Sequence, residues 1–206
     1  MLIQLKDEIK FRNKNILVIG GSPSVLKEKV DIKLLNKCFI VRFNLYETKG
    51  YEDYIGERTD LWIYNGNTAT HNDMIDNPFR KAKNMMMISS PRQIHAKHGH
   101  KEIKKIYADA EHKWIIQKRP WHDIFPVVDS STGLLALLNL AEAYKDKNIY
   151  TLGFSFINQK SEDDNMQNEN YMGTECLVCN HRRDAEESRS KLLMNDYGVK
   201  YFSEMK

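Results

Sequence analysis

His181, late in the chain, is a residue that could transfer a proton in catalysis. His181 precedes an acidic stretch that predicts the first turns of a helix over Asp184–Asp196. Imidazole is the side chain best suited to exchanging protons near neutral pH. A lone histidine before a helix is nevertheless more often a cap than a base. His181 therefore becomes a candidate catalytic base only if other motifs place a substrate beside it.

Two segments combine glycine with hydroxyl side chains and could bind a phosphate. Gly20, Gly21 and Ser22 follow a short apolar run, so they predict a tight turn that a ligand can approach closely. This turn matches neither the dinucleotide-binding nor the P-loop pattern, and an ordinary turn before a helix explains it equally well. The second segment, Ser131–Gly133, opens the most apolar helical stretch of the chain. Its amides and helix dipole favour an anion, although such a segment alone is usually an ordinary helix cap.

Asparagines and glycine stand at three further predicted strand ends. Asn44 and Asn65 each follow a short apolar run, and Gly153-Phe154 follows another. An amide can read base edges and sugar hydroxyls because it both donates and accepts hydrogen bonds. One asparagine in a turn is commonly turn chemistry, but two at matching positions beside a glycine turn favour a ligand.

The sequence supports a metal site less well than it supports a phosphate site. Cys176 and Cys179 form a single CxxC, whereas a structural zinc site needs about four ligands, so two free thiols are the favoured interpretation. Asp163 and Asp164 could bind a metal that holds a diphosphate donor, but their long polar surroundings favour a solvated loop. We therefore expect no metal and no cofactor.

The segments that must position these residues alternate between strand and helix. Short apolar runs predict strands at Ile16–Ile19, Phe39–Phe43, Leu61–Tyr64, Met85–Ile88, Trp114–Ile116, Ile149–Leu152 and Val199–Phe202. Amphipathic stretches predict helices at Ser24–Lys29, Asn72–Lys83, Lys101–His112, Gly133–Tyr144 and Asp184–Asp196. This alternation predicts one α/β domain over residues 1–206, with a mostly parallel sheet of about seven strands flanked by helices. Ligands of such sheets bind beyond the carboxyl ends of the strands, where the residues above are expected.

Composition narrows the class of protein. The chain has 206 residues, 41% hydrophobic and 29% charged, with a formal net charge of +3. These values are typical of a soluble globular protein and give no reason to expect nucleic-acid binding. No apolar stretch reaches the roughly 20 residues of a membrane helix, and the charged N-terminus does not resemble a secretion signal. With three cysteines, an odd number, these features predict a cytoplasmic protein.

Four motifs, taken in order, resemble those of the sialyltransferases of animals and plants. Ile16–Asn65 resembles their large sialyl motif, with Val-Ile-Gly-Gly-Ser, then Cys-Phe-Ile-Val-Arg-Phe-Asn and Gly-Glu-Arg-Thr-Asp. Asp129–Gly153 resembles the small motif, His181 and Glu186 match the H-x-x-x-x-E motif, and Tyr171 lies in a weak match to the short aromatic motif. Bacterial sialyltransferases share this plan. The resemblance implies a Rossmann-like fold of the GT-A variant type.

The resemblance also implies an activity and a role for each residue. It implies metal-independent, inverting transfer of sialic acid, or a related keto-sugar acid, from a CMP-sugar donor to a glycan hydroxyl. His181 would be the general base and Glu186 would orient the chain around it. The donor would be bound by Gly20, Gly21, Ser22, Asn44, Asn65, Ser131, Thr132, Gly133, Gly153, Phe154 and Tyr171. The family's asparagine in the first turn is replaced here, and its usual disulfide has no second cysteine, so Cys38 should be a free thiol.

Two alternatives stay open at this point. The chain could be a non-catalytic module that binds CMP or another nucleotide, since the first turn departs from the family pattern. It could also be a metal-dependent transferase that uses a diphosphate-sugar donor and the Asp163–Asp164 pair. The acceptor, the linkage and the oligomeric state do not follow from the sequence.

Overall fold

The structure, a computed structural model, is a parallel α/β fold. It describes residues 15–27, 29–65, 72, 74–75, 81–89, 96–116, 131–154 and 183–205; at 88–89, 96–100, 112–116 and 183–187 it describes the backbone alone. The strands are β1 (Asn15–Ile19), β2 (Cys38–Phe43), β3 (Leu61–Asn65), β4 (Asn84–Ser89), β5 (Glu111–Ile116), β6 (Asn148–Leu152) and β7 (Lys200–Tyr201). They form one sheet in the order β5-β4-β3-β2-β1-β6-β7.

Every pair of neighbouring strands in the described sheet is parallel. Six strands of five or six residues make the body of the sheet, and the two-residue β7 only extends its edge beyond β6. The predicted α/β class with a parallel sheet is therefore confirmed, while the predicted last strand at Val199–Phe202 is shorter than expected because the 3-10 turn η3 (Phe202–Glu204) follows it directly.

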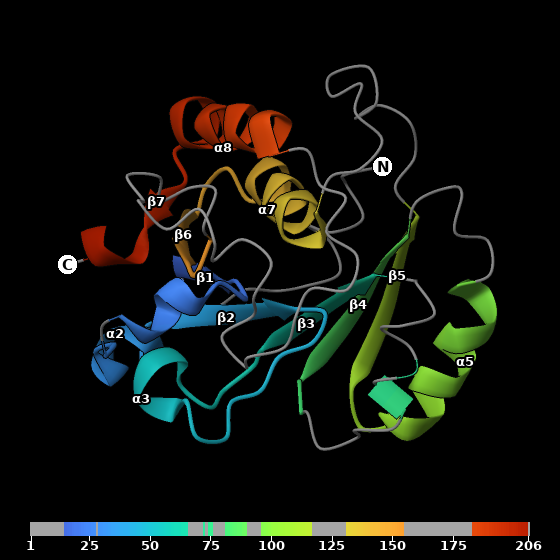
Figure 1. Cartoon of the computed structure of the whole chain (residues 1–206). Coiled ribbons are helices and arrows are strands. Elements are labelled where there is room, and N and C mark those ends of the chain that lie inside the picture. Colours follow the sequence, from blue (N-terminus) through green and yellow to red (C-terminus); the bar gives the residue numbers. More distant parts are fainter. Residues whose placement is uncertain are drawn as a thin grey trace.

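Helices cover both faces of the sheet (Figure 1). They are the 3-10 helix η1 (Pro23–Leu26), α2 (Ile32–Asn36), α3 (Glu52–Ile55), α5 (Ala96–Ile106), α7 (Thr132–Ala143) and α8 (Arg183–Tyr197). α7 and α8 pack on one face, and η1, α2 and α3 lie on the other, with α5 beside β4 and β5. Within the described part of the chain, none of these helices is long and apolar enough to cross a membrane.

Alternation along the strands explains the two-sided core. In β1, Ile16 and Val18 belong to the cluster under α7, whereas Leu17 and Ile19 belong to the cluster under α2 and α3. Successive side chains of a strand point to opposite faces, so a strand buried on both sides must be apolar throughout. α7 is largely apolar, and nine of its twelve residues are buried.

Several helices differ from the sequence-based expectation. Ser24–Lys29 is not a helix of that length, because the 3-10 turn η1 begins at Pro23 and ends at Leu26. The helix predicted at Lys101–His112 begins earlier, at Ala96, and ends at Ile106; His112 instead pairs with Met85 in the sheet. α2 and α3, of five and four residues, were not predicted, since elements this short show no helical period.

The strand order creates a reversal point at β1. From β1 the chain adds β2, β3, β4 and β5 on one side and then returns to place β6 on the other. The segment after β1 lies on the α2 face, whereas α7, which leads into β6, lies on the opposite face. Parallel sheets bind ligands in the crevice that this divergence opens at the carboxyl ends of the strands.

Cys38 is a free thiol at the amino end of β2, as expected. Its Sγ lies 3.5 Å from Leu34 O and from Met205 Sδ, and the residue is fully buried. Burial raises the pKa of this thiol to about 11, with a smaller opposing effect of the Arg58 charge. A raised pKa favours the neutral thiol, so only about one molecule in a thousand carries the thiolate at pH 8.

We therefore expect native Cys38 to resist alkylation. Iodoacetamide at pH 8 should leave it unmodified over times that fully label a cysteine-containing peptide, and unfolding in urea should restore labelling. Mass spectrometry of the digested protein would follow the modification. Equal labelling rates of Cys38 in native and unfolded protein would contradict the burial.

Candidate functional site

The turns that follow β1 and β6 lie against one another at the reversal point. Gly20 N donates to Leu152 O (2.7 Å) and Ser22 N donates to Gly153 O (3.1 Å). A Cβ on Gly20 would lie 2.1 Å from Gly153 O. Gly153 has φ +73°, and a Cβ there would lie 2.2 Å from Val25 Cγ1. Both glycines are thus required for the close approach of two backbones.

Gly20→Ala should destabilise the protein strongly, because the atoms that its Cβ would meet are backbone atoms that cannot move aside. We expect a loss of about 3 kcal/mol or more in the free energy of unfolding. Gly50→Ala is the matched control, since its Cβ meets nothing within 4 Å and costs only the left-handed backbone, about 1–2 kcal/mol. Urea unfolding would compare the two, and equal losses would contradict the packing.

Ser22 has a structural role in this turn. Its Oγ accepts a hydrogen bond from Ser24 N (3.3 Å) and caps η1. Its backbone N–H is engaged by Gly153 O, so neither group points freely at a ligand; Gly21, between Gly20 and Ser22, is half-buried.

Asn44, Asn65 and Thr132 form a polar cluster at the carboxyl edge of the sheet. Asn44 directly follows β2, Asn65 ends β3, and Thr132 is the first residue of α7. Asn65 N donates to Asn44 Oδ1 (3.0 Å), and Asn65 Nδ2 donates to Thr132 Oγ1 (3.4 Å). Three residues that are separated by up to 88 positions in sequence thus come together, as the strand-end rule predicted.

Asn44 has a strained backbone. Its φ is +48°, and it is the one residue other than glycine with a positive φ in the described chain. This conformation costs an L-residue about 1–2 kcal/mol, least for asparagine and aspartate. Backbone strain of this kind is concentrated at functional sites, where the surroundings hold it in place.

The first turn of α7 presents backbone amides beside this cluster. Ser131 Oγ accepts from Leu134 N (3.3 Å), so Ser131 is the N-cap and the amides of Thr132 and Gly133 remain at the helix terminus. The terminus of a helix of this length carries roughly half a positive charge. Backbone amides, a threonine hydroxyl and two carboxamides are together suited to binding an anionic oxygen.

Gly133 and Phe154 support this turn from below. A Cβ on Gly133 would lie 2.6 Å from Phe43 Cζ and 3.0 Å from Phe154 Cε1. The rings of Phe43 and Phe154 are 5.6 Å apart, and Phe154 is buried. Phe154, which we predicted as a donor-binding residue, therefore packs in the core beneath the α7 terminus, where it sets how closely the helix approaches the sheet.

Two buried residues that the sequence did not single out hold the segments that follow β2. Arg42, 1% exposed, donates through Nη2 to Ile55 O (2.6 Å) and Gly56 O (2.9 Å) and through Nε to Thr59 Oγ1 (3.1 Å). Trp62 Nε1 donates to Asn44 O (2.8 Å). The signal in the sequence was a cation within an apolar strand, since a buried charge needs partners.

Three predicted site residues are only partly or not described. Tyr171 and His181 lie outside the described residues, as do Cys176, Cys179, Asp163 and Asp164. The backbone of Glu186 lies in the first turns of α8, whose described side chains include three that are buried: Arg189, Ser190 and Leu193. The described residues contain no group of three or more His, Cys, Asp or Glu arranged to hold a metal ion.

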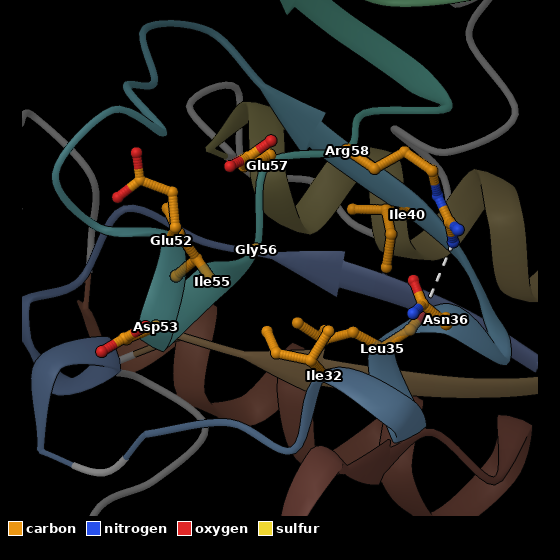
Figure 2. Close-up of a pocket in the computed structure, with 10 residues that line it drawn as sticks. All are labelled: Ile32, Leu35, Asn36, Ile40, Glu52, Asp53, Ile55, Gly56, Glu57 and Arg58. Atoms are coloured by element: carbon orange, nitrogen blue, oxygen red, sulfur yellow. Dashed lines mark hydrogen bonds between the residues drawn. The ribbon is translucent and has the colours of Figure 1, made fainter.

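A hollow elsewhere in the described structure is lined by residues of α2, α3 and the segment before β3 (Figure 2). It has a volume of about 410 Å³ and is lined by Ile32, Leu35, Asn36, Ile40, Glu52, Asp53, Ile55, Gly56, Glu57 and Arg58. The hollow lies between α2 and α3, on the face of the sheet opposite α7. The guanidinium of Arg58, which lines the hollow, already donates hydrogen bonds to Cys38 O, to Leu35 O and to Asp60 Oδ2. The polar cluster at the carboxyl edge therefore remains the better candidate site.

Comparison with known proteins supports the fold. No protein-family profile matches the chain, and no curated protein matches it. Two crystal structures of a mammalian sialyltransferase are similar to it in structure. One is bound to Gal-beta-1-3GalNAc-ortho-nitrophenol and is 14% identical, with a TM-score of 0.55; the other is 15% identical, with a TM-score of 0.57. In both cases the match covers 92% of this chain and 69% of the other, so this chain has a sialyltransferase-like fold.

Proposed function

We propose that the protein is a glycosyltransferase that moves sialic acid, or a related keto-sugar acid, from a CMP-sugar to a glycan hydroxyl. The observation that carries the proposal is the meeting of Asn44, Asn65 and Thr132 at the terminus of α7. This cluster lies at the carboxyl edge of a sheet whose fold resembles that of sialyltransferases. The motif order in the sequence supports the same assignment.

The chemistry of the cluster fits a nucleoside monophosphate. A CMP-sugar carries a single phosphate, whose charge can be offset by the amides of Thr132 and Gly133 and by carboxamide N–H groups. Asn44 Oδ1 already accepts from Asn65 N, so the Asn44 Nδ2 is the atom of this amide that would donate to the phosphate. A diphosphate would carry more charge, which usually recruits a divalent cation. The proposal is therefore a metal-independent transferase.

The proposed reaction is a direct displacement. His181 takes the proton from the acceptor hydroxyl as that oxygen attacks the anomeric carbon, and the bond from this carbon to the phosphate oxygen breaks. CMP leaves with the bonding electron pair, and the configuration at the anomeric carbon inverts. Glu186 orients the segment around His181, and Tyr171 assists departure of the phosphate. These three roles rest on the sequence motifs.

A panel of donors tests the proposal. The purified protein is incubated with CMP-sialic acid, with CMP-linked keto-sugar acids and with UDP-sugars, once in EDTA and once with added Mg²⁺ or Mn²⁺. Release of CMP or UDP is followed with and without a galactoside acceptor. We expect CMP release from CMP-sugars alone. UDP release that depends on Mg²⁺ or Mn²⁺ would contradict the proposal, and CMP binding without turnover would favour the non-catalytic alternative.

A further inference from the structure

The backbone carbonyl of Asn44 has a single described side-chain partner, the indole of Trp62. Trp62 Nε1 donates to Asn44 O across 2.8 Å, and Trp62 is fully buried. Asn44 N donates in turn to Ile63 O (2.8 Å). Both backbone groups of the one strained asparagine are thus engaged by β3, the strand next to it.

The side chain of Asn44 is oriented by the same strand. Asn65 N can only donate, and it lies 3.0 Å from Asn44 Oδ1, so the oxygen of the amide must face Asn65. The other end of the amide, the Asn44 Nδ2, is then the end that can donate a hydrogen bond. A change in the backbone of Asn44 would rotate this amide, because its Cα–Cβ bond direction follows φ and ψ.

Trp62 is itself held by aromatic neighbours. Its ring meets those of Tyr46 and Tyr107 edge to face, at centroid distances of 5.3 and 5.2 Å. Arg42 lies over the Tyr46 ring, 5.6 Å from its centroid, while its guanidinium binds the carbonyls at the end of α3. The indole N–H therefore has a fixed position from which to hold Asn44 O.

We infer that Trp62 is a positioning residue for nucleotide binding. Its indole N–H holds Asn44 in the left-handed conformation, and this conformation directs the Asn44 Nδ2 to the phosphate. The inference rests on the proposed function, since it concerns the same site, but it assigns to a buried core residue an effect on ligand affinity. Trp62 does not touch the ligand.

A double-mutant cycle tests this inference. Trp62→Phe keeps an aromatic ring and removes the N–H, and it should weaken CMP binding about 3- to 10-fold by isothermal titration. In an Asn44→Gly background, where glycine tolerates the positive φ and the amide is absent, the same change should alter the CMP dissociation constant less than about 2-fold. Equal weakening in both backgrounds would overturn the inference in favour of a general packing effect.

Tyr107→Phe is the matched control. It removes a buried hydrogen bond of the same cluster, from Tyr107 Oη to Met74 O (3.0 Å), without touching Asn44. It should destabilise the protein less than Trp62→Phe does, because it leaves a smaller cavity, and leave the CMP dissociation constant unchanged. A similar loss of CMP affinity in both variants would also overturn the inference.

Nuclear magnetic resonance separates this inference from the proposed function. The side-chain amide signals of Asn44, identified by their loss in Asn44→Gly, should shift in Trp62→Phe but not in Tyr107→Phe, with no nucleotide present. If the wild-type protein binds no CMP, the proposed function fails. The Asn44 amide signals then still show whether Trp62 positions the Asn44 side chain. Unchanged Asn44 amide signals in Trp62→Phe would overturn the role of Trp62.

Discussion

His181→Ala should lower the turnover number of sugar transfer by about 10²- to 10⁴-fold, the range that a general base contributes. The donor site is built from other residues, so the dissociation constant for CMP should stay within about 2-fold of the wild-type value. The turnover number would be measured by CMP release in the presence of acceptor, and CMP binding by isothermal titration.

The pH dependence distinguishes a base from a structural cap. A general base must be deprotonated to act, so wild-type kcat should fall as the pH is lowered through the pKa of the imidazole, whose ordinary value is about 6.5. His181→Ala should lose this acid limb. Transfer at the wild-type rate, or an acid limb that remains in the variant, would contradict the assignment of His181.

Asn44→Asp should weaken CMP binding by about 10- to 100-fold or more. Aspartate tolerates the left-handed conformation and keeps the oxygen that accepts from Asn65 N. It replaces the Nδ2 donor by an anionic oxygen that repels the phosphate. A hydrogen bond to a charged group contributes about 1.5–3 kcal/mol, which corresponds to about 10- to 150-fold in a dissociation constant.

Asn148→Asp is the control for this substitution. Asn148 is exposed at the amino end of β6, where its Nδ2 donates to Asn15 Oδ1 (3.0 Å). Asn148→Asp therefore adds the same negative charge as Asn44→Asp, but at the opposite edge of the sheet. Its CMP dissociation constant should equal that of the wild type. Equal effects of the two variants would indicate a response to net charge, and no effect of Asn44→Asp would place the nucleotide elsewhere.

The sheet could be predicted from the sequence because its strands are buried on both faces. Each strand is then a continuous apolar run bounded by turn residues, and these runs were found at all six full strands, although β5 begins at Glu111, before the predicted Trp114. Polar residues at the exposed start of an edge strand do not show this pattern. α2 and α3 were missed because their formation depends on packing against Leu17 and Ile40 in the core, and a local pattern does not contain such contacts.

The candidate site could be predicted only in part. The strand-end rule brought Asn44, Asn65 and Thr132 together, since it depends only on the parallel topology. It did not reveal that Phe154 packs in the core or that Ser22 caps η1, because a residue after a strand can turn inward as readily as outward. The contact between Trp62 and Asn44 joins two strands, and the sequence gives no local sign of it.

The central claim is that CMP binds at the carboxyl edge of the sheet. Titration of CMP into ¹⁵N-labelled protein in EDTA, followed by amide chemical shifts, tests this claim most directly. The account predicts the largest shifts at Asn44, Asn65, Thr132 and Gly133, and none at Ile32 or Glu57 in the hollow between α2 and α3. Shifts confined to that hollow, or no shifts at millimolar CMP, would contradict it.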